Sequence, residues 1–198
     1  MNYGYPMQQF KDGSALSYGN GYFYVLNKDG SLKESNGVPL QFKGLGNCKE
    51  GYRYAHINGN TYGYLREEDF TLVTFQANYI NDIENGFGLI TTTDNKFMFF
   101  DASLNKLLEE KYDNAFITGK HTRVVGSDKD GWRILFDNKT YLEAFEHSKK
   151  TFATRQEALK FALDWESAPE KITRASLRKV KNGDNPAVIL DNPNIFKK

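Results

Sequence analysis

The chain of 198 residues is long enough for one sizeable domain with an appendage. Its 26 basic and 25 acidic side chains give a net charge of +1, which argues against a nucleic-acid partner because phosphate backbones are bound by concentrated Lys and Arg. Fifteen Phe, twelve Tyr and 17 Gly favour half-buried strands and frequent turns, so we expect a mainly β protein.

The N-terminal segment and the single cysteine narrow the class of protein further. "MNYGYPMQQF" has neither a basic start nor an apolar core, so we expect no signal peptide. No apolar run approaches the roughly 20 residues that span a bilayer, so we expect no membrane partner. Cys48 has no second cysteine for a disulfide and belongs to no zinc-binding pattern. These features predict a cytoplasmic protein, or one assembled into a particle that is made in the cytoplasm.

Four segments share one pattern: a turn of Gly, Asn or Asp, then an aromatic residue, then a short apolar run. They are "NGYFYVLN" (20–27), "GNTYGYL" (59–65), "DNKFMFFD" (94–101) and "DGWRILFD" (130–137). The aromatic residues Tyr22, Tyr62, Phe97 and Trp132 are spaced 40, 35 and 35 residues apart. From the second unit on, one strand-like run precedes the turn and another follows the unit. The sequence therefore predicts an array of antiparallel three-stranded β-repeat units over about residues 15–145.

Three segments carry a resemblance to a known family. "NGNTYGYL" holds an aromatic-Gly-aromatic run at 62–64, "DGWRILFD" holds Trp132, and "KYDNAF" begins with Lys-Tyr-Asp at 111–113. These motifs resemble those of WG-repeat (KWG-repeat) proteins, although the Trp-Gly pair is intact in none of the four units. The resemblance covers about residues 18–145. It implies a β-repeat architecture and binding mediated by the repeats.

A helix is predicted over 151–170, "TFATRQEALKFALDWESAPE". Thr154, with Glu157 three residues on, forms a capping box, and apolar side chains follow at helical spacing. Pro169 marks the end of the helix. We expect this helix to cap the last repeat, because an uncovered terminal repeat invites further strand pairing.

The C-terminal tail, residues 171–198, is basic at first and then apolar. Five Lys or Arg side chains precede "AVIL", and Asn-Pro pairs punctuate the rest. We expect Ile189, Leu190 and Phe196 to dock, either on the same chain or on a partner. The chain is thus predicted to divide into a repeat domain (1–150), the capping helix and this tail.

The stretch "GSDKDGWRILFD" (126–137) begins like a calcium loop, with Asp128 and Asp130 before a glycine. An EF-hand loop needs oxygen ligands at alternate positions and glycine at the sixth. Here Gly131 stands fourth and Trp132 fifth, so the match fails after two ligands. Asp-Gly between two apolar runs instead predicts a β-hairpin.

No group of side chains indicates catalysis. His56 and His121 fall on or near equivalent strands of two units, but neither His147 nor another residue is indicated as a third metal ligand. Cys48 follows a Gly-rich loop with no base beside it, and "FKGLGN" lacks the strand and helix of a phosphate-binding loop. We expect no enzymatic activity, no cofactor and no bound metal.

Exposed aromatic side chains are the candidate binding surface. Tyrosine combines a rigid apolar body with a polar tip, which suits contacts with a partner. The alternative is that the tyrosines are cross-strand pairs that hold a curved sheet. The residues predicted to bind a partner are Tyr52, Tyr54, Tyr62, Tyr64, Trp132, Ile189, Leu190 and Phe196.

These features predict a non-enzymatic protein-binding module that acts through its repeat surface and its tail. A composition rich in Asn, Lys, Ile, Phe and Tyr suggests a bacterial or phage source. In that setting an immunity- or inhibitor-type protein would fit, and so would a virion component. The alternative function is a ligand- or glycan-binding β-repeat module whose Tyr and Trp side chains stack on sugar rings. The identity of the partner and the oligomeric state stay open.

Overall fold

The computed structural model describes residues 4–137, 145–147 and 151–167. The chain divides into two compact units. Among the described residues, 4–95 and 99–107 form the first unit, and 96–98, 108–137, 145–147 and 151–167 belong to the second. Strands dominate the described residues, and the predicted mainly β class with one C-terminal helix is confirmed.

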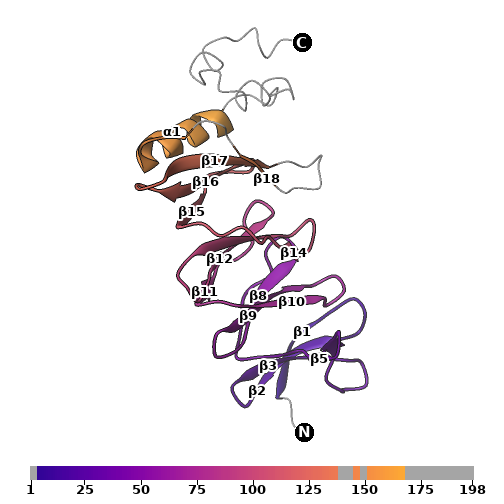
Figure 1. Ribbon diagram of the computed structural model, residues 1–198. Helices are drawn as coiled ribbons and strands as arrows, with labels where there is room; N and C mark the ends of the chain where they lie inside the picture. Colours follow the sequence, from indigo (N-terminus) through magenta and orange to yellow (C-terminus); the bar gives the residue numbers. More distant parts are fainter. Residues whose placement is uncertain (1–3, 138–144, 148–150, 168–198) are drawn as a thin grey trace. The chain divides into compact units, whose positions relative to one another are not determined.

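The first unit holds two antiparallel sheets of four strands each and most of a third, in which only Phe97 and Met98 of β13 are assigned to the second unit (Figure 1). The first sheet has the order β1 (Tyr5–Gln9), β2 (Ala15–Gly19), β3 (Tyr22–Leu26), β6 (Gln41–Phe42). The second has the order β7 (Gly44–Leu45), β8 (Tyr52–Asn58), β9 (Thr61–Arg66), β10 (Leu72–Gln76). The third has the order β11 (Tyr79–Ile80), β12 (Phe87–Thr91), β13 (Phe97–Asp101), β14 (Lys106–Leu107). A two-stranded hairpin, β4 (Glu34–Ser35) and β5 (Val38–Pro39), is inserted between β3 and β6.

The repeat register predicted from the sequence is confirmed, because the four quoted segments become β3, β9, β13 and β17, the third strand of each sheet. The number of strands per unit was predicted wrongly, since each sheet has four strands rather than three. The additional strands come from the segments between units: Tyr79–Ile80 becomes β11 and Asn114–Ile117 becomes β15. Such short strands show no alternation of apolar and polar residues, so sequence periodicity cannot reveal them.

Four turns share one left-handed backbone geometry. Both central residues have positive φ at Asn20-Gly21 (51° and 81°), Asn36-Gly37 (52° and 77°), Glu50-Gly51 (50° and 83°) and Asn85-Gly86 (53° and 81°). Two consecutive residues with positive φ define the type I′ turn, whose twist matches that of the strands it joins. These turns set the register of the strands on either side.

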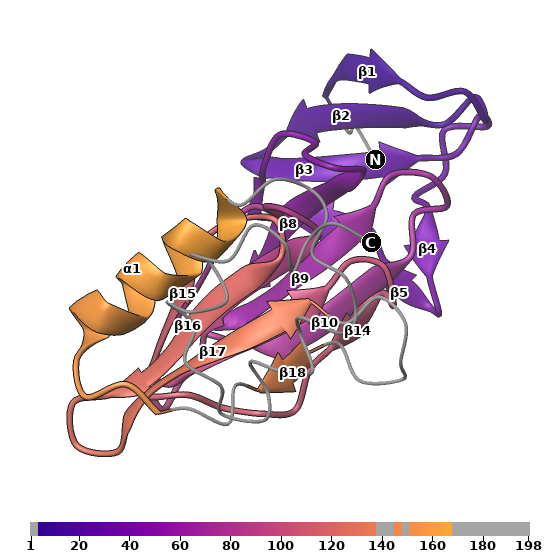
Figure 2. The ribbon, with the colours of Figure 1, turned by 90° about the horizontal axis from the view of Figure 1, so that it is seen from above.

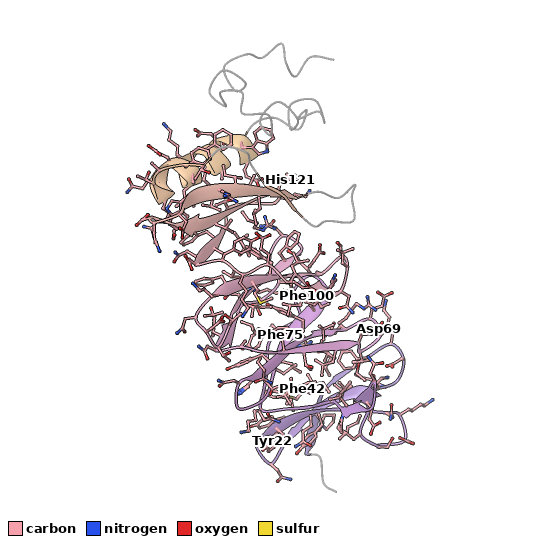
Figure 3. The ribbon with its side chains drawn as sticks, viewed as in Figure 1. Tyr22, Phe42, Asp69, Phe75, Phe100 and His121 are labelled. Atoms are coloured by element: carbon pink, nitrogen blue, oxygen red, sulfur yellow. The ribbon has the colours of Figure 1, made fainter. Side chains whose placement is uncertain are left out.

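The first and second sheets share one apolar core. The first sheet contributes Leu16, Val25 and Phe42, and the second contributes Ala55, Leu65 and Leu72. Leu40, just before β6, and Phe70, just before β10, complete the core. Phe42, labelled in Figure 3, and Leu40 are both fully buried. Because strand side chains alternate between faces, this core uses only one face of the second sheet. Its other face is free to pack elsewhere.

The second unit holds the fourth sheet, with the order β15 (Asn114–Ile117), β16 (Thr122–Ser127), β17 (Gly131–Asp137), β18 (Phe145–His147). Figure 2 shows helix α1 (Arg155–Glu166) lying along the face of β16 and β17. A core of Val124, Trp132, Ile134, Phe152, Ala158, Phe161, Ala162 and Trp165 joins helix to sheet. The predicted C-terminal helix is therefore confirmed, and it covers Arg155–Glu166 within the predicted range 151–170.

The start of α1 follows the predicted cap. Thr154 is the N-cap residue in extended conformation, and its Oγ1 accepts a hydrogen bond from the Glu157 backbone N–H at 3.3 Å. The helix ends at Glu166, where the Ser167 N–H donates to the Leu163 carbonyl. Pro169, the predicted end, lies outside the described residues, as does the tail 171–198.

Candidate functional site

The four tyrosines predicted to bind a partner share one face of the second sheet. Tyr54 on β8 pairs with Tyr64 on β9, and the period of two places Tyr52 and Tyr62 on the same face. The exposed fraction is 6% for Tyr52 and 0% for Tyr64, whereas Tyr54 and Tyr62 are half-buried. This face is therefore mostly interior.

The third sheet covers this tyrosine face. The ring centroid of Phe100, labelled in Figure 3, lies 4.7 Å from that of Tyr64 and 5.7 Å from that of Tyr52. Tyr64 Oη donates to the Asn81 carbonyl at 2.6 Å, and Tyr52 Oη donates to the Ala102 carbonyl at 2.7 Å. Burial raises the pKa of the Tyr64 phenol, so the hydroxyl stays a donor. The prediction that Tyr52 and Tyr64 face a partner is wrong; they pack between sheets, as the alternative held.

Trp132 was also predicted to bind a partner and is instead part of the core under α1. It is 3% exposed, and its indole ring lies 6.0 Å from that of Phe116. The indole Nε1–H donates to Asp128 Oδ1 at 2.9 Å, so its polar edge is satisfied within the hairpin. The remaining predicted residues, Ile189, Leu190 and Phe196, lie outside the described residues.

The hairpin predicted at 126–137 is confirmed. Ser127 on β16 pairs with Gly131 on β17, and Gly131 has a φ of 82°. Asp130 Oδ2 accepts a hydrogen bond from Ser127 Oγ at 3.0 Å, and Asp128 Oδ1 accepts one from the Trp132 indole N–H. Both carboxylates are used to shape the turn. Within the ranges that the structure describes, no three His, Cys, Asp or Glu side chains gather as a group that could hold a metal ion.

The environments of His56, His121 and Cys48 do not indicate catalysis or metal binding. His56 stacks on Tyr62 at 4.5 Å between centroids, and its Nε2 lies 2.8 Å from the Gly59 carbonyl. The backbone N–H of His121, labelled in Figure 3, donates to Glu166 Oε1 at 2.6 Å. Desolvation and the neighbouring Glu67 raise the pKa of the Cys48 thiol, which is opposite to the shift of a reactive thiolate.

An exposed apolar cluster lies at the free edge of the first sheet. Met7 on the edge strand β1 is 61% exposed and Tyr18 on β2 is 45% exposed. The Tyr18 ring lies 4.8 Å from that of half-buried Phe23, its cross-strand partner on β3. Met7 sits in a β-bulge of β1, between Pro6, which pairs with Ser17, and Gln8, which pairs with Leu16. We call Met7, Tyr18 and Phe23 the apolar margin.

Sequence analysis did not select the apolar margin. The predicted array began at about residue 15, so strand β1 and Met7 fell outside the repeats. Tyr18 shares a sheet face with Leu16, which is only 4% exposed, and alternation alone cannot tell the two apart. Leu16 reaches the core against the second sheet, whereas Tyr18 does not belong to that core.

A polar cleft of about 260 Å³ lies in the second unit, on the side of the β16–β17 hairpin that carries Val125 and Arg133. It is lined by Glu110, Lys111, Tyr112, Asp113, Val125, Gly126, Ser127, Asp130, Gly131 and Arg133. Two of the three segments that resemble WG repeats, "KYDNAF" and "DGWRILFD", therefore meet at this cleft. Among the described residues, Tyr112 is the one aromatic residue that lines it, because the Trp132 side chain is part of the core under α1.

The carboxylates of the cleft are held by neighbouring groups. Lys96 forms an ion pair with Asp113 and lowers the pKa of that carboxyl below its usual value. Burial, and then a hydrogen bond to Glu110, raise the pKa of the Tyr112 phenol. The guanidinium of Arg133 is exposed and has no carboxylate partner within the described residues. Arg133 is thus an exposed cation that the cleft offers to a ligand.

Comparisons with known proteins identify no family. No protein-family model and no curated protein matches the chain. Among solved structures, BamB from Moraxella catarrhalis is similar at 12% identity and a TM-score of 0.31, over 74% of this chain and 50% of BamB. A chain of the S. cerevisiae complex of Dbp5 bound to Nup159, Gle1, IP6 and ADP is similar at 10% identity and a TM-score of 0.37, over 83% of this chain and 45% of the other. This chain therefore spans about half the length of the structures it matches, and similarity at this level establishes no shared function.

The length of the helix in the described residues is relevant to membrane insertion. Helix α1 is 12 residues long, and no helix in the described part of the chain has the length and apolar character needed to cross a lipid bilayer.

Proposed function

We propose that the chain is a non-enzymatic protein-binding module whose contact surface is the apolar margin. The observation that carries this proposal is the exposure of Met7 (61%) and Tyr18 (45%) on the neighbouring strands β1 and β2 at the edge of the first sheet. Methionine and tyrosine are enriched at the centres of protein interfaces and are poorly placed in water. The proposal moves the contact surface away from Tyr52, Tyr64 and Trp132, which are buried.

The edge position of β1 supports a protein partner. An edge strand presents main-chain groups on its free side, and a partner can add a strand there or pack on the side chains beside it. The bulge at Met7 interrupts regular pairing along β1. We therefore expect side-chain contacts at Met7 and Tyr18 to contribute more than strand addition.

We propose that the tail supplies a second contact. Ile189, Leu190 and Phe196 are apolar side chains in a segment punctuated by Asn-Pro pairs, a composition that suits an extended docking segment. A basic stretch precedes them and would suit an acidic rim on the partner.

The test uses the full chain as bait in an extract of the cell that encodes it. Met7→Ala with Tyr18→Ala is compared with Tyr79→Ala, which removes a 60% exposed tyrosine from another part of the first unit. A partner retained by the wild type and by the Tyr79 variant, but lost with the margin variant, supports the proposal. If all three proteins retain the partner equally, the apolar margin is not the contact surface. Ile189→Ser with Leu190→Ser, in the full chain, reports separately on the tail.

The polar cleft favours a second candidate function, the binding of a small polar or saccharide ligand. This function is supported by the cleft itself, which is lined by Tyr112, Asp113, Asp130 and the exposed Arg133. A glycan array probed with the wild type and with Arg133→Ala tests it. Binding that the Arg133 variant loses would favour this function, and the absence of any glycan signal would reject the saccharide.

A further inference from the structure

Three Asn-Gly turns of the first unit share one backbone geometry, and two of them, Asn36-Gly37 and Asn85-Gly86, differ in their surroundings. Asn36-Gly37 has φ values of 52° and 77°, and Asn85-Gly86 has 53° and 81°. The first pair is exposed, and the second is half-buried. Any difference in chemistry between them therefore comes from their neighbours rather than from their residue types or their φ angles.

The Asn85-Gly86 turn is clamped by a carboxylate. Glu50 Oε1 accepts the backbone N–H of Asn85 at 2.9 Å, and Glu50 Oε2 accepts that of Gly86 at 2.7 Å. Hydrogen bonds to a charged acceptor are the stronger class, so this turn is held in place. Among the described residues, no carboxylate contacts the Asn36-Gly37 turn, and a side chain at Gly37 would meet nothing within 4 Å.

Asparagine before glycine can lose its side-chain amide without an enzyme. The backbone nitrogen of the glycine gives up its proton and attacks the asparagine Cγ. A nitrogen–carbon bond forms, the Cγ–amide bond breaks, and ammonia leaves with a proton taken from water. Water then opens the cyclic imide to aspartate or isoaspartate. The step needs a free glycine N–H and a backbone that can rotate, which the Glu50 clamp denies to Gly86.

We propose that Asn36 is a site of spontaneous deamidation and that Glu50 protects Asn85 from the same reaction. Asn36 closes a hairpin of only two residue pairs, Glu34↔Pro39 and Ser35↔Val38. A short hairpin without a clamp at its turn gives the backbone the freedom that the attack requires.

Deamidation at Asn36 has a structural consequence. Isoaspartate adds a methylene to the main chain, and this two-residue turn cannot keep its geometry with the longer backbone. The neighbouring Ser35 is buried, and its Oγ accepts the backbone N–H of Leu72 on β10 at 2.9 Å. Disruption of the hairpin removes that bond and leaves a buried donor beside the core of the first and second sheets. Conversion of Asn36 therefore weakens the first unit.

The experiment follows deamidation by peptide mapping. Folded wild-type protein is incubated at mildly alkaline pH, and the converted fraction is measured by mass spectrometry at each Asn-Gly pair, including Asn20-Gly21 and Asn58-Gly59. Asn36 is expected to convert several times faster than Asn85. The same incubation in concentrated urea is the control for local sequence. Because both asparagines precede glycine, Asn36 and Asn85 should deamidate at similar rates in the unfolded chain.

Two outcomes overturn the proposal: Asn85 converting as fast as Asn36 in the folded chain, or the same ratio of rates in the folded and unfolded chain. Glu50→Ala tests the clamp itself, since it should accelerate deamidation at Asn85 and leave the rate at Asn36 unchanged. If deamidation at Asn85 is not accelerated, Glu50 does not protect it.

Protein converted at Asn36, separated by ion exchange, is expected to unfold at a lower urea concentration than unconverted protein. An unchanged midpoint would refute the structural consequence. None of these readouts depends on a partner.

Discussion

Two tyrosines of the first unit show what burial does to one residue type. Tyr64 lies between the second and third sheets with no exposed surface, and its hydroxyl donates to a backbone carbonyl. Tyr79 is 60% exposed. Tyr64 therefore contributes to stability through packing, while Tyr79 has no such role.

Tyr64→Ala is expected to lower the free energy of unfolding by about 3–5 kcal/mol, because it leaves a cavity between two sheets and an unsatisfied carbonyl at Asn81. Tyr79→Ala should change it by no more than about 0.5 kcal/mol. Urea unfolding of both variants, followed by tyrosine fluorescence or circular dichroism, makes the comparison. Similar losses in the two variants would show that Tyr64 is not a packing residue.

The Asp69 carboxylate, labelled in Figure 3, makes stability depend on pH. It accepts hydrogen bonds from Arg66 and from the Thr71 backbone and hydroxyl. Arg66 above all holds the pKa of Asp69 well below its usual 3.8. Since the folded-state pKa is depressed, this stabilisation is complete above 3.8 and is lost as the pH falls through the folded-state pKa.

Asp69→Asn is therefore expected to be less stable than wild type at neutral pH, with the gap closing as the solution is acidified below pH 3.8. Added salt should also narrow the gap, because the Arg66–Asp69 pair is partly exposed. Unfolding midpoints measured across this pH range report the difference. A difference in stability between wild type and Asp69→Asn that does not vary with pH would contradict the depressed pKa of Asp69.

At the scale of elements, the second and third sheets are packed so closely that glycine is required at one contact. A Cβ added to Gly88 on β12 would lie 2.2 Å from the Tyr64 hydroxyl. A Cβ added to Gly44 on β7 would lie 3.5 Å from its nearest neighbour, His56 Cβ, which is an ordinary contact. Neither glycine has a positive φ, so the two positions differ in space alone.

Gly88→Ala is accordingly expected to cost about 1–3 kcal/mol of unfolding free energy, as overpacking does in other cores. Gly44→Ala, the matched control, should stay within about 0.5 kcal/mol of wild type. In a double-mutant cycle, Tyr64→Ala should relieve part of the Gly88→Ala cost, because the clash is with that ring. Strict additivity of the two substitutions would mean that the sheets do not meet at this point.

Helix α1 depends on its N-cap. Removing the hydroxyl in Thr154→Ala leaves the Glu157 N–H without its acceptor and should cost about 1 kcal/mol. Thr154→Ser keeps the acceptor and should be nearly neutral. Thermal unfolding of both variants distinguishes loss of the cap from a general effect at this position, and equal losses would exclude the cap as the cause.

At the scale of the whole molecule, the sequence predicted the features that repeat or that have a local signal. The aromatic residues Tyr22, Tyr62, Phe97 and Trp132 marked the third strand of every sheet, and Thr154 marked the start of the helix. Local turn chemistry and hydrophobic spacing were sufficient for these elements.

The sequence did not reveal which face of a strand is covered. The pairing of β8 with β9 puts Tyr52, Tyr54, Tyr62 and Tyr64 on one face, and only the third sheet, through Phe100 and its neighbours, makes this face interior. The two-residue strands β7 and β11 were missed because they are too short to show an alternation of apolar and polar residues. A further repeated signal was overlooked: Asp-x-Ser or Asp-x-Thr at 29–31, 69–71 and 101–103, where the Asp side chain binds the N–H and hydroxyl two residues on.

Site-specific photocrosslinking in the cell that encodes the chain tests the proposed function most directly. A photoreactive amino acid replaces Tyr18 in the apolar margin, and in a second strain it replaces Tyr79, which is more exposed but lies outside the margin. The account predicts one discrete covalent adduct with a protein from position 18 and none from position 79. An adduct from position 79 alone, or no adduct from position 18, would contradict it.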